Sequence, residues 1–339
     1  MKIYAITITP QSPFGTPLKG DTLFGQFCWQ AAEDNALLTD GLDAWLSRYD
    51  ETPFAIFSTA WPVIAEQDST WIAVPRPPLP DIRPKPVNRR EKILRHKDDK
   101  KKKWLLLDAT LTIDMQEERL KTDHELFEMF LASQDQKTAA TLDELEGEQR
   151  RLAVPVTRMH NTINRLSHTT GTGMFAPYSH ENHQYLPGLN LVVFAAVDEK
   201  ALDADRLKAG FDRMGAWGFG RDASTGLGRF SVNQVRALDW PVAQKNHNAC
   251  YTLGPCVPQK KTFARRQATP FTRFGKHGVA LASKNPFKQP VVMADEGALL
   301  YPAQRQQVFS RPWTGTAIRG ISVSDKRTVM QGYSLYLPC

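Results

Sequence analysis

Alternating apolar and polar positions define the first elements that the chain predicts. Residues 2–9 (KIYAITIT) alternate in this way and are rich in Ile and Thr, which predicts a half-buried strand. A loop punctuated by Pro and Gly follows. Residues 21–35 then carry apolar side chains at helical spacing from Leu23 to Ala31, and Asp21 stands where a helix N-cap is expected. The chain therefore opens as strand, long loop and helix.

Further strand and helix patterns follow along the chain. Residues 54–61 form a second candidate strand, and residues 184–197 (QYLPGLNLVVFAAV) give the most apolar strand signal in the chain. Residues 203–217 predict an amphipathic helix, and residues 229–238 alternate again as a strand. The repeated order of strand, helix and strand predicts a split ferredoxin-like arrangement, the α+β fold that the RNA recognition motif (RRM) also uses. We expect this RRM-like domain to occupy residues 1–240.

A charged segment interrupts the expected domain at about residues 75–150. Prolines crowd residues 75–90, which argues against regular structure there. Residues 83–103 carry 11 Lys and Arg against three acids, whereas residues 114–148 carry 11 acids against three basic residues and look helical. Two interpretations stay open: a solvated insertion whose opposite charges partly offset each other, or a mobile basic arm that touches RNA.

The end of the chain differs in charge from the rest. Residues 245–339 carry 14 Lys and Arg against three acids, and the whole chain has a net charge of +7. Several short strand signals and few helical ones predict a smaller, basic α+β or mostly β domain at 241–339, after a short linker. A basic region of this kind favours a polyanionic partner such as nucleic acid.

Composition narrows the class of protein further. A hydrophobic content of 41% over 339 residues supports cored domains rather than disorder. No window reaches the roughly 18 consecutive apolar residues that a membrane span requires, so no membrane partner is expected. The four cysteines form no Cys-x-x-Cys pair, and we predict free thiols in a reducing cytoplasm, with no bound metal or cofactor.

The segment GFGRDASTGLGRF, residues 218–230, contains two Gly-x-Gly pairs around a short polar loop. Each pair encloses one apolar residue, Phe219 or Leu227. The glycines lie between a predicted helix and a predicted strand, which excludes a dinucleotide fingerprint, and the NTPase phosphate-loop pattern is absent. One interpretation is a sharp helix-to-strand turn. The other is close approach of the backbone to nucleic acid, because four glycines exceed what one turn requires.

The glycine pattern, Gly-apolar-Gly-x5-Gly-apolar-Gly after the last helix, resembles the C-terminal glycine-rich loop of the CRISPR-associated RAMP superfamily. Three further stretches are similar to the fourth Csm subunit of type III-A effector complexes, a Cas-five-like protein. They are LKGDTLFGQFCW at 18–29, HNTINRLSHTTGTGMF at 160–175 and KNPFKQPVVMADEGALL at 284–300. In the second stretch, Asn164 stands where Asp is common and Ser167 where Thr is common.

The resemblance implies a non-catalytic RNA-binding subunit of a type III-like CRISPR effector ribonucleoprotein in antiviral defence. Such a subunit binds the 5′ repeat-derived tag of the CRISPR RNA (crRNA) and joins the large polymerase-like subunit to a backbone RAMP subunit. The segment 158–175 would supply a finger lying against the RNA, with an ordinary exposed hairpin as the alternative, and the glycine loop would hold tag phosphates and bases.

The resemblance also implies a set of RNA contacts. In the finger these are Arg158, His160, Asn161, Asn164, Arg165, His168 and Phe175, with Tyr178 as a further stacking residue. In the glycine loop they are Gly218, Phe219, Gly220, Arg221, Ser224, Thr225, Gly226, Gly228 and Arg229. Elsewhere they are Lys19, Lys276, Lys284 and Lys288, where the basic C-terminal lysines would face either RNA or an acidic protein partner.

A second hypothesis is a metal-independent RAMP endoribonuclease that processes CRISPR repeat RNA. Such cleavage needs a general base and a general acid, commonly His paired with Tyr, Lys or another His. Four histidines fall around the proposed finger: His160, His168, His180 and His183. Asp21, the one acid placed like the catalytic Asp of backbone subunits, is expected to cap a helix, so we expect no enzyme activity. The tag-capping subunit of a type IV complex and a general RNA-binding protein stay open as well.

Overall fold

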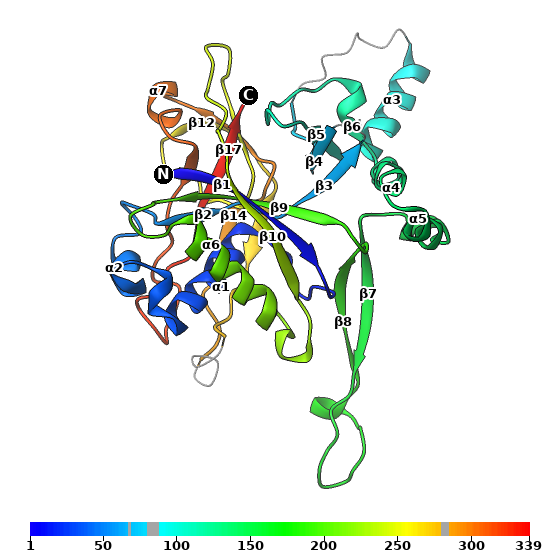
Figure 1. Ribbon diagram of the computed structural model, residues 1–339, viewed down its shortest axis with the longest axis vertical. Coiled ribbons are helices and arrows are strands. Elements are labelled where there is room, and N and C mark those ends of the chain that lie inside the picture. Colours follow the sequence, from blue (N-terminus) through cyan, green and yellow to red (C-terminus); the bar gives the residue numbers. More distant parts are fainter. Residues whose placement is uncertain (67–68, 80–87, 279–284) are drawn as a thin grey trace.

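The computed structural model describes residues 1–66, 69–79, 88–278 and 285–339 (Figure 1). Its largest unit is an antiparallel sheet of eight strands in the order β10-β1-β9-β3-β4-β5-β6, with β2 also paired to β9. The strands are β1 (Lys2–Pro10), β2 (Ala55–Phe57), β3 (Trp61–Glu66), β4 (Ser69–Pro75), β5 (Trp104–Leu107), β6 (Leu120–Lys121), β9 (Asn190–Val197) and β10 (Phe230–Ala237). All four strands expected in residues 1–240 contribute to this sheet, with 54–61 corresponding to β2 and the start of β3.

The strands β1 and β9 form the centre of the sheet. Every residue of β9 from Leu191 to Val197 is at most 4% exposed, which explains its continuous apolar sequence. Two helices, α1 (Gly20–Glu33) and α6 (Ala204–Trp217), pack side by side on the sheet (Figure 1). Their close approach requires Gly210, because a Cβ there would lie 2.3 Å from the ring of Phe27. The two helices are those that the sequence predicts.

Helix α1 begins differently from the expectation. Its N-cap is Lys19, whose side chain makes no capping hydrogen bond, and Asp21 lies in the first turn of the helix. The buried Asp21 carboxylate accepts hydrogen bonds from Arg273 in β13 (Pro270–Arg273), at 2.6 Å from Nε and 2.9 Å from Nη2. The assignment of Asp21 as a helix cap is therefore wrong, because a guanidinium from the C-terminal part of the chain binds it instead.

The charged insertion is built partly into the main sheet. Its helices are α3 (Arg89–Lys101), α4 (Asp123–Ala132) and α5 (Gln136–Asp143), and the last two confirm the helical reading of residues 114–148. Strands β4, β5 and β6 lengthen the sheet, and the side chains from Leu105 to Leu107 are buried. Lys102 and Lys103 form ion pairs with Asp98 and Asp123. The opposite charges thus offset each other as expected, but the insertion also contributes to the core.

A long hairpin, which we call the finger, consists of β7 (Ala153–His160), β8 (Tyr178–Tyr185) and the connecting residues 161–177. It projects away from the body of the molecule (Figure 1). The base of the finger is attached to the loop after β1, because the backbones of Phe14 and His183 form an antiparallel bridge and the rings of Phe14 and Tyr185 are in edge contact at 5.6 Å.

The C-terminal part contains a second antiparallel sheet in the order β12-β15-β11-β17-β16 and a separate pair, β13 with β14. Its strands are β11 (Cys250–Thr252), β12 (Phe263–Gln267), β14 (Val291–Ala294), β15 (Leu299–Pro302), β16 (Trp313–Gly315) and β17 (Tyr333–Pro338). The remaining helices are α2 (Gly41–Ser47) and α7 (Arg305–Val308), and 3-10 turns are η1 (Asn35–Leu37), η2 (Glu117–Arg119), η3 (Gly147–Gln149), η4 (Gly173–Phe175) and η5 (Ala223–Thr225). This part is mostly β, as the sequence predicts.

The two sheets share one hydrophobic core. Leu335 and Leu337 of β17 belong to the same buried cluster as Ile6 of β1. The side-chain amide of Gln331, which is fully buried, accepts from the Phe57 amide at 2.9 Å and donates to the Phe57 carbonyl at 2.7 Å. The Gln331 side chain thus satisfies the backbone amide and carbonyl of Phe57 in β2, which would otherwise require backbone partners.

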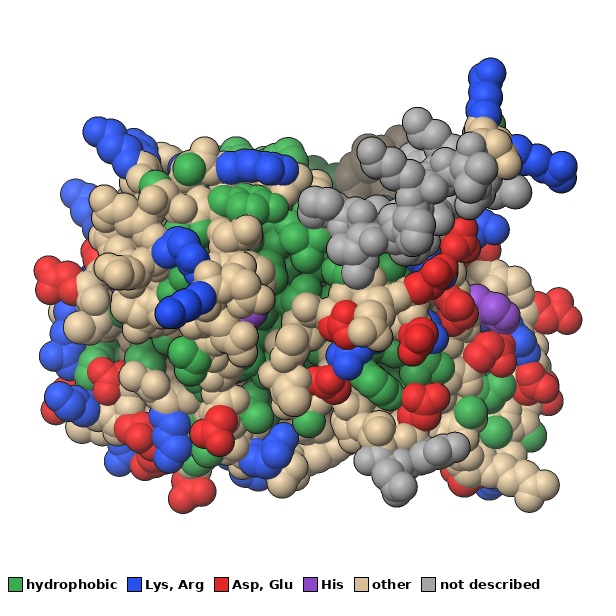
Figure 2. Space-filling view, turned by 90° about the horizontal axis from the view of Figure 1, so that it is seen from above, with side chains coloured by type: hydrophobic (Ala, Val, Ile, Leu, Met, Phe, Trp, Pro, Cys, Tyr) green, Lys and Arg blue, Asp and Glu red, His purple; other side chains and the backbone are tan. Residues whose placement is uncertain are grey.

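The face opposite the tip of the finger bears charge of both signs (Figure 2). Acidic side chains gather on the side of the insertion, whereas Lys and Arg predominate on the other side. Among the described residues, no helix is long and apolar enough to cross a membrane.

Candidate nucleic-acid interface

The glycine loop between α6 and β10 reverses the chain through five residues with positive φ, its four glycines and Asp222. Its glycines have φ angles from 72° to 95°, which side-chain-bearing residues rarely adopt. A Cβ at Gly228 would lie 2.1 Å from the carbonyl oxygen of Phe219, and a Cβ at Gly218 would lie 2.5 Å from that of Leu227. The two Gly-x-Gly pairs therefore pack their backbones against each other.

The other two glycines border the crest of the loop, residues 220–226. A Cβ at Gly220 would lie 2.5 Å from the Cβ of Thr16, whereas nothing lies within 4 Å of the Cβ position at Gly226. Packing within the chain thus requires three of the four glycines, and Gly226 faces open space. Close packing within the protein therefore explains most of the glycines in this loop, and their number does not by itself indicate a nucleic-acid partner.

The apolar residues of the loop anchor it to the core. Phe219 is 1% exposed and its ring lies 6.5 Å from that of Phe14, while Leu227 is 4% exposed. Phe219 was expected to contact RNA, but its side chain is a core residue and does not reach the surface. Arg229 is exposed and donates a hydrogen bond to the carbonyl of Ala216 at the end of α6. The side chains exposed on or beside the crest are Arg221, Ser224, Thr225 and Arg229.

The crest of the glycine loop contacts the base of the finger. Arg221 Nη2 donates to the carbonyl oxygen of Glu181 at 2.7 Å and to Oδ1 of Asn182 at 3.1 Å. His180 Nδ1 lies 3.3 Å from Oδ2 of Asp222. We call these five residues the loop–finger junction. It joins the glycine loop to residues 180–182 of the same hairpin that carries the other segment predicted to bind RNA, 158–175.

The connecting residues of the finger present polar groups to solvent. Asn164 shapes the turn, because its Oδ1 accepts from the amide of Leu166 at 2.9 Å and its carbonyl accepts from the amide of His168 at 2.8 Å. His168 adopts a left-handed φ of 54°. Phe175, the last residue of the turn η4, is half-buried. The expected RNA contacts whose side chains are exposed are Arg158, Asn161, Arg165 and His168.

Sequence reasoning missed the apolar character of this finger. Leu166 is 94% exposed, Met174 83%, Met159 67% and Ile163 59%. These residues occur singly among polar ones, so no periodic pattern draws attention to them. Exposed apolar side chains on a projecting hairpin can stack against bases or insert between them.

Three aromatic rings on one face of the finger form a cluster that faces the glycine loop. The His160 and Tyr178 rings are stacked with their centroids 5.2 Å apart and an interplanar angle of 6°. The His180 ring lies 5.1 Å from each of them. Of the four histidines named from the sequence, the structure brings together only His160 and His180 among the described residues. Asp222, which completes the group, gave no sequence signal because its position depends on a left-handed φ of 61°.

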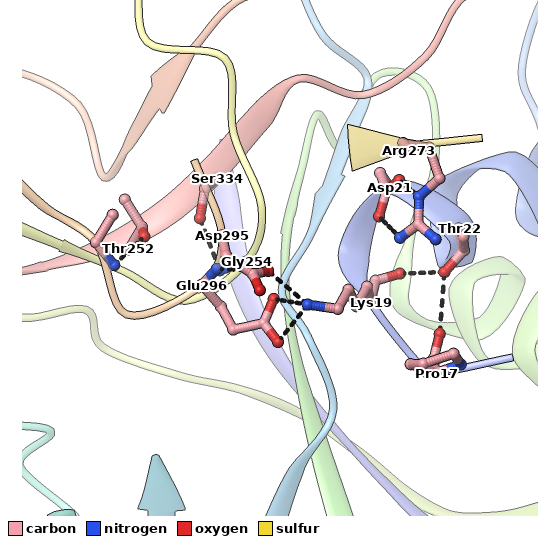
Figure 3. Close-up of polar contacts among 11 residues, drawn as sticks. Pro17, Lys19, Asp21, Thr22, Thr252, Gly254, Arg273, Asp295, Glu296 and Ser334 are labelled. Carbon is pink, nitrogen blue, oxygen red and sulfur yellow. Dashed lines mark hydrogen bonds and ion pairs between the residues drawn. The ribbon is translucent and has the colours of Figure 1, made fainter. Parts of the chain in front are cut away.

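A second meeting point, the buried junction, joins the start of α1 to the C-terminal part (Figure 3). Lys19 Nζ lies 2.5 Å from Oδ1 of Asp295 and 2.7 Å from both carboxylate oxygens of Glu296. The Asp21–Arg273 pair lies beside it. The two stretches that resemble the fourth Csm subunit at 18–29 and 284–300 are therefore in direct contact. Lys19 was expected to contact RNA, but its ammonium group is already bound by two carboxylates.

The buried junction holds one carboxyl group with an altered proton affinity. Burial, together with the hydrogen bond and negative charge of Asp295, raises the pKa of Glu296 to about 7, although Lys19 opposes the shift. Hydrogen bonds from Glu296 and Lys19 outweigh burial at Asp295 and hold its pKa below the usual value. Of the two carboxyl groups, Glu296 is therefore the one that binds a proton more readily, while Asp295 stays ionised.

Of the remaining lysines proposed from the sequence, Lys288 lies near α1 and Lys276 lies against Phe287. Lys288 lines a cavity of about 750 Å³ together with Cys28 of α1 and His277, and burial lowers the pKa of Lys288. The ammonium of Lys276 lies 4.8 Å from the centroid of the Phe287 ring. Lys284 lies outside the described residues.

Comparison with known proteins gives a result only at the level of structure. No family model matches the chain, and no curated protein sequence matches it. Among solved structures, a chain of the Csm3-Csm4 subcomplex in the type III-A CRISPR-Cas interference complex aligns with a TM-score of 0.54 at 12% identity, covering 100% of this chain and 99% of that chain. A chain of the Csm1-Csm4 cassette in complex with cA4 aligns with a TM-score of 0.50 at 13% identity, covering 100% and 97%.

These alignments define the class of fold. The chain has a mixed α/β fold with antiparallel sheets, similar to that of a chain in the Csm3-Csm4 subcomplex of the type III-A CRISPR-Cas interference complex. Csm4 is the subunit named in both complexes, and the fold of this chain is Csm4-like over its full length.

Proposed function

We propose that this protein is a non-catalytic RNA-binding subunit of a type III-like CRISPR effector ribonucleoprotein. In this role it binds the 5′ repeat-derived tag of the crRNA and joins the large polymerase-like subunit to a backbone RAMP subunit. The observation that carries the proposal is the loop–finger junction, which joins the glycine loop to the hairpin that carries the second predicted RNA-binding segment, 158–175. The likeness to a Csm4-containing subcomplex over the full chain supports the assignment to this class of complex.

The strand order of the main sheet supports the finer description of the fold. In the order β10-β1-β9-β3, the strands rank fourth, first, third and second along the chain when the insertion is set aside. Helices α1 and α6 follow the first and third of these strands. This is the arrangement of a split βαβ, ferredoxin-like domain. We assign residues 1–240 to this domain and 241–339 to a smaller basic domain that packs on it.

The proposed RNA surface runs from the crest of the glycine loop onto the inner face of the finger. Exposed donors suited to phosphate and ribose lie at both ends, namely Ser224 and Thr225 on the crest and Arg158 and Arg165 on the finger. Tyr178 is 46% exposed and offers a ring on which a base can stack. The side chains of Phe219 and Lys19 do not belong to this surface, since one is in the core and the other is in the buried junction.

The assembly role rests on the complexes in which similar folds occur. One similar chain comes from a complex with Csm1 and the other from a complex with Csm3. A subunit that joins two different neighbours needs two separate protein surfaces besides its RNA surface. The exposed apolar residues of the finger and of the C-terminal part, such as Phe274 and Val292, provide surface for such contacts.

The direct test is to purify the chain after co-expression with a CRISPR array and the neighbouring effector subunits, and to sequence the RNA that remains bound. We expect crRNA with one fixed 5′ end, and loss of that RNA when residues 161–177 are replaced by a short Gly-Ser turn. Circular dichroism of the shortened variant checks that the body still folds. RNA of random sequence, or none, in the intact complex would contradict the proposal.

A metal-independent endoribonuclease is a second candidate, favoured by the stacked His160 and Tyr178 rings with His180 beside them. A His and Tyr group of this kind can supply the general base and acid for RNA cleavage. Incubating the purified chain with repeat RNA in EDTA distinguishes the two functions. Site-specific cleavage that disappears in His180→Ala would favour the nuclease; intact RNA would favour the binding subunit.

A further inference from the structure

The base of the finger and the glycine loop together present three side chains of the kinds that bind metal ions. They are His160 at the end of β7, His180 in β8 and Asp222 on the crest of the loop, and all three are partly buried. One potential ligand atom from each residue lies within 4.8 Å of the other two. The group is separate from the buried junction and comes from three segments of the chain.

The strand register explains why the two histidines share a face. His160 lies directly opposite Tyr178 across the hairpin, and His180 is two residues further along β8. Side chains two apart in a strand point to the same side, and diagonal neighbours across a hairpin are within reach of each other. Asn182 continues the same face and is 1% exposed beneath the glycine loop. The face that carries both histidines is therefore the one turned toward Asp222.

The hydrogen bonding of this His–His–Asp group is incomplete among the described residues. His160 Nε2 is buried and has no hydrogen-bond partner among the described residues, which is costly for a polar nitrogen. Its ring is held by the parallel ring of Tyr178, so it has little freedom to turn toward solvent. His180 approaches Asp222 at 3.3 Å, and Arg221 Nε lies 3.5 Å from the same carboxylate oxygen. A hydrogen bond between His180 and Asp222 leaves the His160 nitrogen unsatisfied.

We propose that His160, His180 and Asp222 bind a divalent transition-metal ion, with Zn²⁺ as the best match. Two imidazole nitrogens and one carboxylate are ligands that Zn²⁺ accepts at about 2.0–2.2 Å, whereas Mg²⁺ and Ca²⁺ prefer oxygen. The three ligand atoms lie within 4.8 Å of one another, so His180 and Asp222 need to move only slightly toward His160 to meet around one ion. Three protein ligands leave a fourth position for water or for an anionic ligand.

The proposed ion connects the finger to the glycine loop more firmly than hydrogen bonds alone. It fixes the angle at which the hairpin leaves the body, because its ligands come from β7, β8 and the loop. The positive charge of Arg221 beside Asp222 opposes binding, so the affinity is set by the two histidines more than by the carboxylate. The site depends only on this chain and needs neither RNA nor a partner subunit.

The experiment uses the purified full chain, stripped with a chelator and dialysed, and then titrated with Zn²⁺ in a calorimeter. We expect one Zn²⁺ per chain, and binding weakened at least about tenfold in His160→Ala, His180→Ala and Asp222→Asn. His183→Ala is the matched control, since His183 lies in the same strand on the opposite face and should bind like the wild type. A thermal midpoint that rises with Zn²⁺ in the wild type and in the control, but not in the ligand variants, is a second expected result.

Cobalt substitution provides a readout that does not depend on variants folding. Co²⁺ bound to the wild-type chain should show the intense visible absorption of a four-coordinate site, and added Zn²⁺ should abolish it. The proposal is overturned if the stripped wild type takes up less than one Zn²⁺ per chain, or if the ligand variants bind as tightly as His183→Ala. Because no RNA is present, failure here leaves the RNA-binding role untouched, and loss of RNA binding leaves the metal site untouched.

Discussion

The buried junction and the loop–finger junction use the same kinds of side chain in opposite environments. In the buried junction, Lys19 and Arg273 are matched by carboxylates, and the Asp21 side chain is 1% exposed. In the loop–finger junction, Arg221 is 38% exposed and binds mainly a carbonyl and an amide oxygen. Charge in the first region is satisfied by the chain itself, whereas charge in the second retains capacity for an external anion. Basic residues near a motif therefore indicate an RNA surface only when they stay exposed, as Arg221 does beside the single carboxylate of Asp222, and are not enclosed by carboxylates of the protein.

The largest expected effect is the loss of Arg273. Arg273→Ala leaves the Asp21 carboxylate buried and unpaired, and we expect the free energy of unfolding to fall by about 3–5 kcal/mol. Arg327→Ala, which removes exposed ion pairs with Asp43 and Asp325, should lower it far less, because solvent screens a fully exposed guanidinium. Urea denaturation measures both. Equal losses in the two variants would remove the distinction between buried and exposed charge.

The glycine loop offers a matched pair of substitutions. Gly228→Ala places a Cβ 2.1 Å from a backbone oxygen at a φ of 72°, and we expect a cost of about 3 kcal/mol. Gly226→Ala meets open space at a φ of 93°, so only the backbone conformation opposes it, at about 1 kcal/mol. Thermal midpoints should separate the two variants. A similar loss in both would show that close packing within the loop is not what requires glycine.

The raised pKa of Glu296, about 7, predicts a pH dependence for the buried junction. The folded chain binds this proton more tightly than the unfolded chain, so the free energy of unfolding should fall as pH rises from about 4.5 to about 7. The change is at most about 3 kcal/mol. Asp295 adds no slope in this window, because its lowered pKa keeps it ionised in both states. Glu296→Gln should remove this falling contribution in denaturation profiles across pH, and Glu33→Gln, an exposed control in α1, should retain it.

The smallest effects on stability should occur in the proposed RNA surface. Arg158→Ala removes an exposed side chain of the finger and should change the free energy of unfolding by less than about 0.5 kcal/mol. Arg221→Ala also removes two hydrogen bonds of the loop–finger junction and should cost about 1 kcal/mol. In each variant, the slope of the logarithm of the crRNA binding constant against the logarithm of salt concentration should become shallower by about one, the contribution of one phosphate contact. An unchanged salt slope in both would place the RNA elsewhere.

The sequence predicts best the elements that one large core covers. Strands β1 and β10 alternate, β9 is continuously apolar, and helices α1 and α6 carry apolar residues at helical spacing. The finger strands carry polar residues on both faces, as in YSHENHQY, so alternation gives no strand signal there. The extension of the sheet by β5 and β6 is too short to produce a pattern.

The candidate site was less predictable than the fold. The glycine loop and the finger were proposed as RNA-binding from a resemblance, but their contact depends on where Arg221 and Asp222 point after two glycines with positive φ, Gly218 and Gly220. Phe219 and Lys19 were included because of their positions beside motifs, and burial alone separates them from the surface. The pairing of His160 with His180 follows from a hairpin register that local sequence does not specify.

The shared core has a consequence for how the protein is made. Strand β17 packs on β2 and β9, and Gln331 completes the hydrogen bonding of Phe57, so the first sheet is incomplete until these late residues arrive. A ribosome must translate most of the chain before they emerge, and until then the nascent polypeptide exposes an apolar surface. Chaperones that shield such surfaces during translation would therefore raise the yield of this protein more than that of one whose amino-terminal half folds independently.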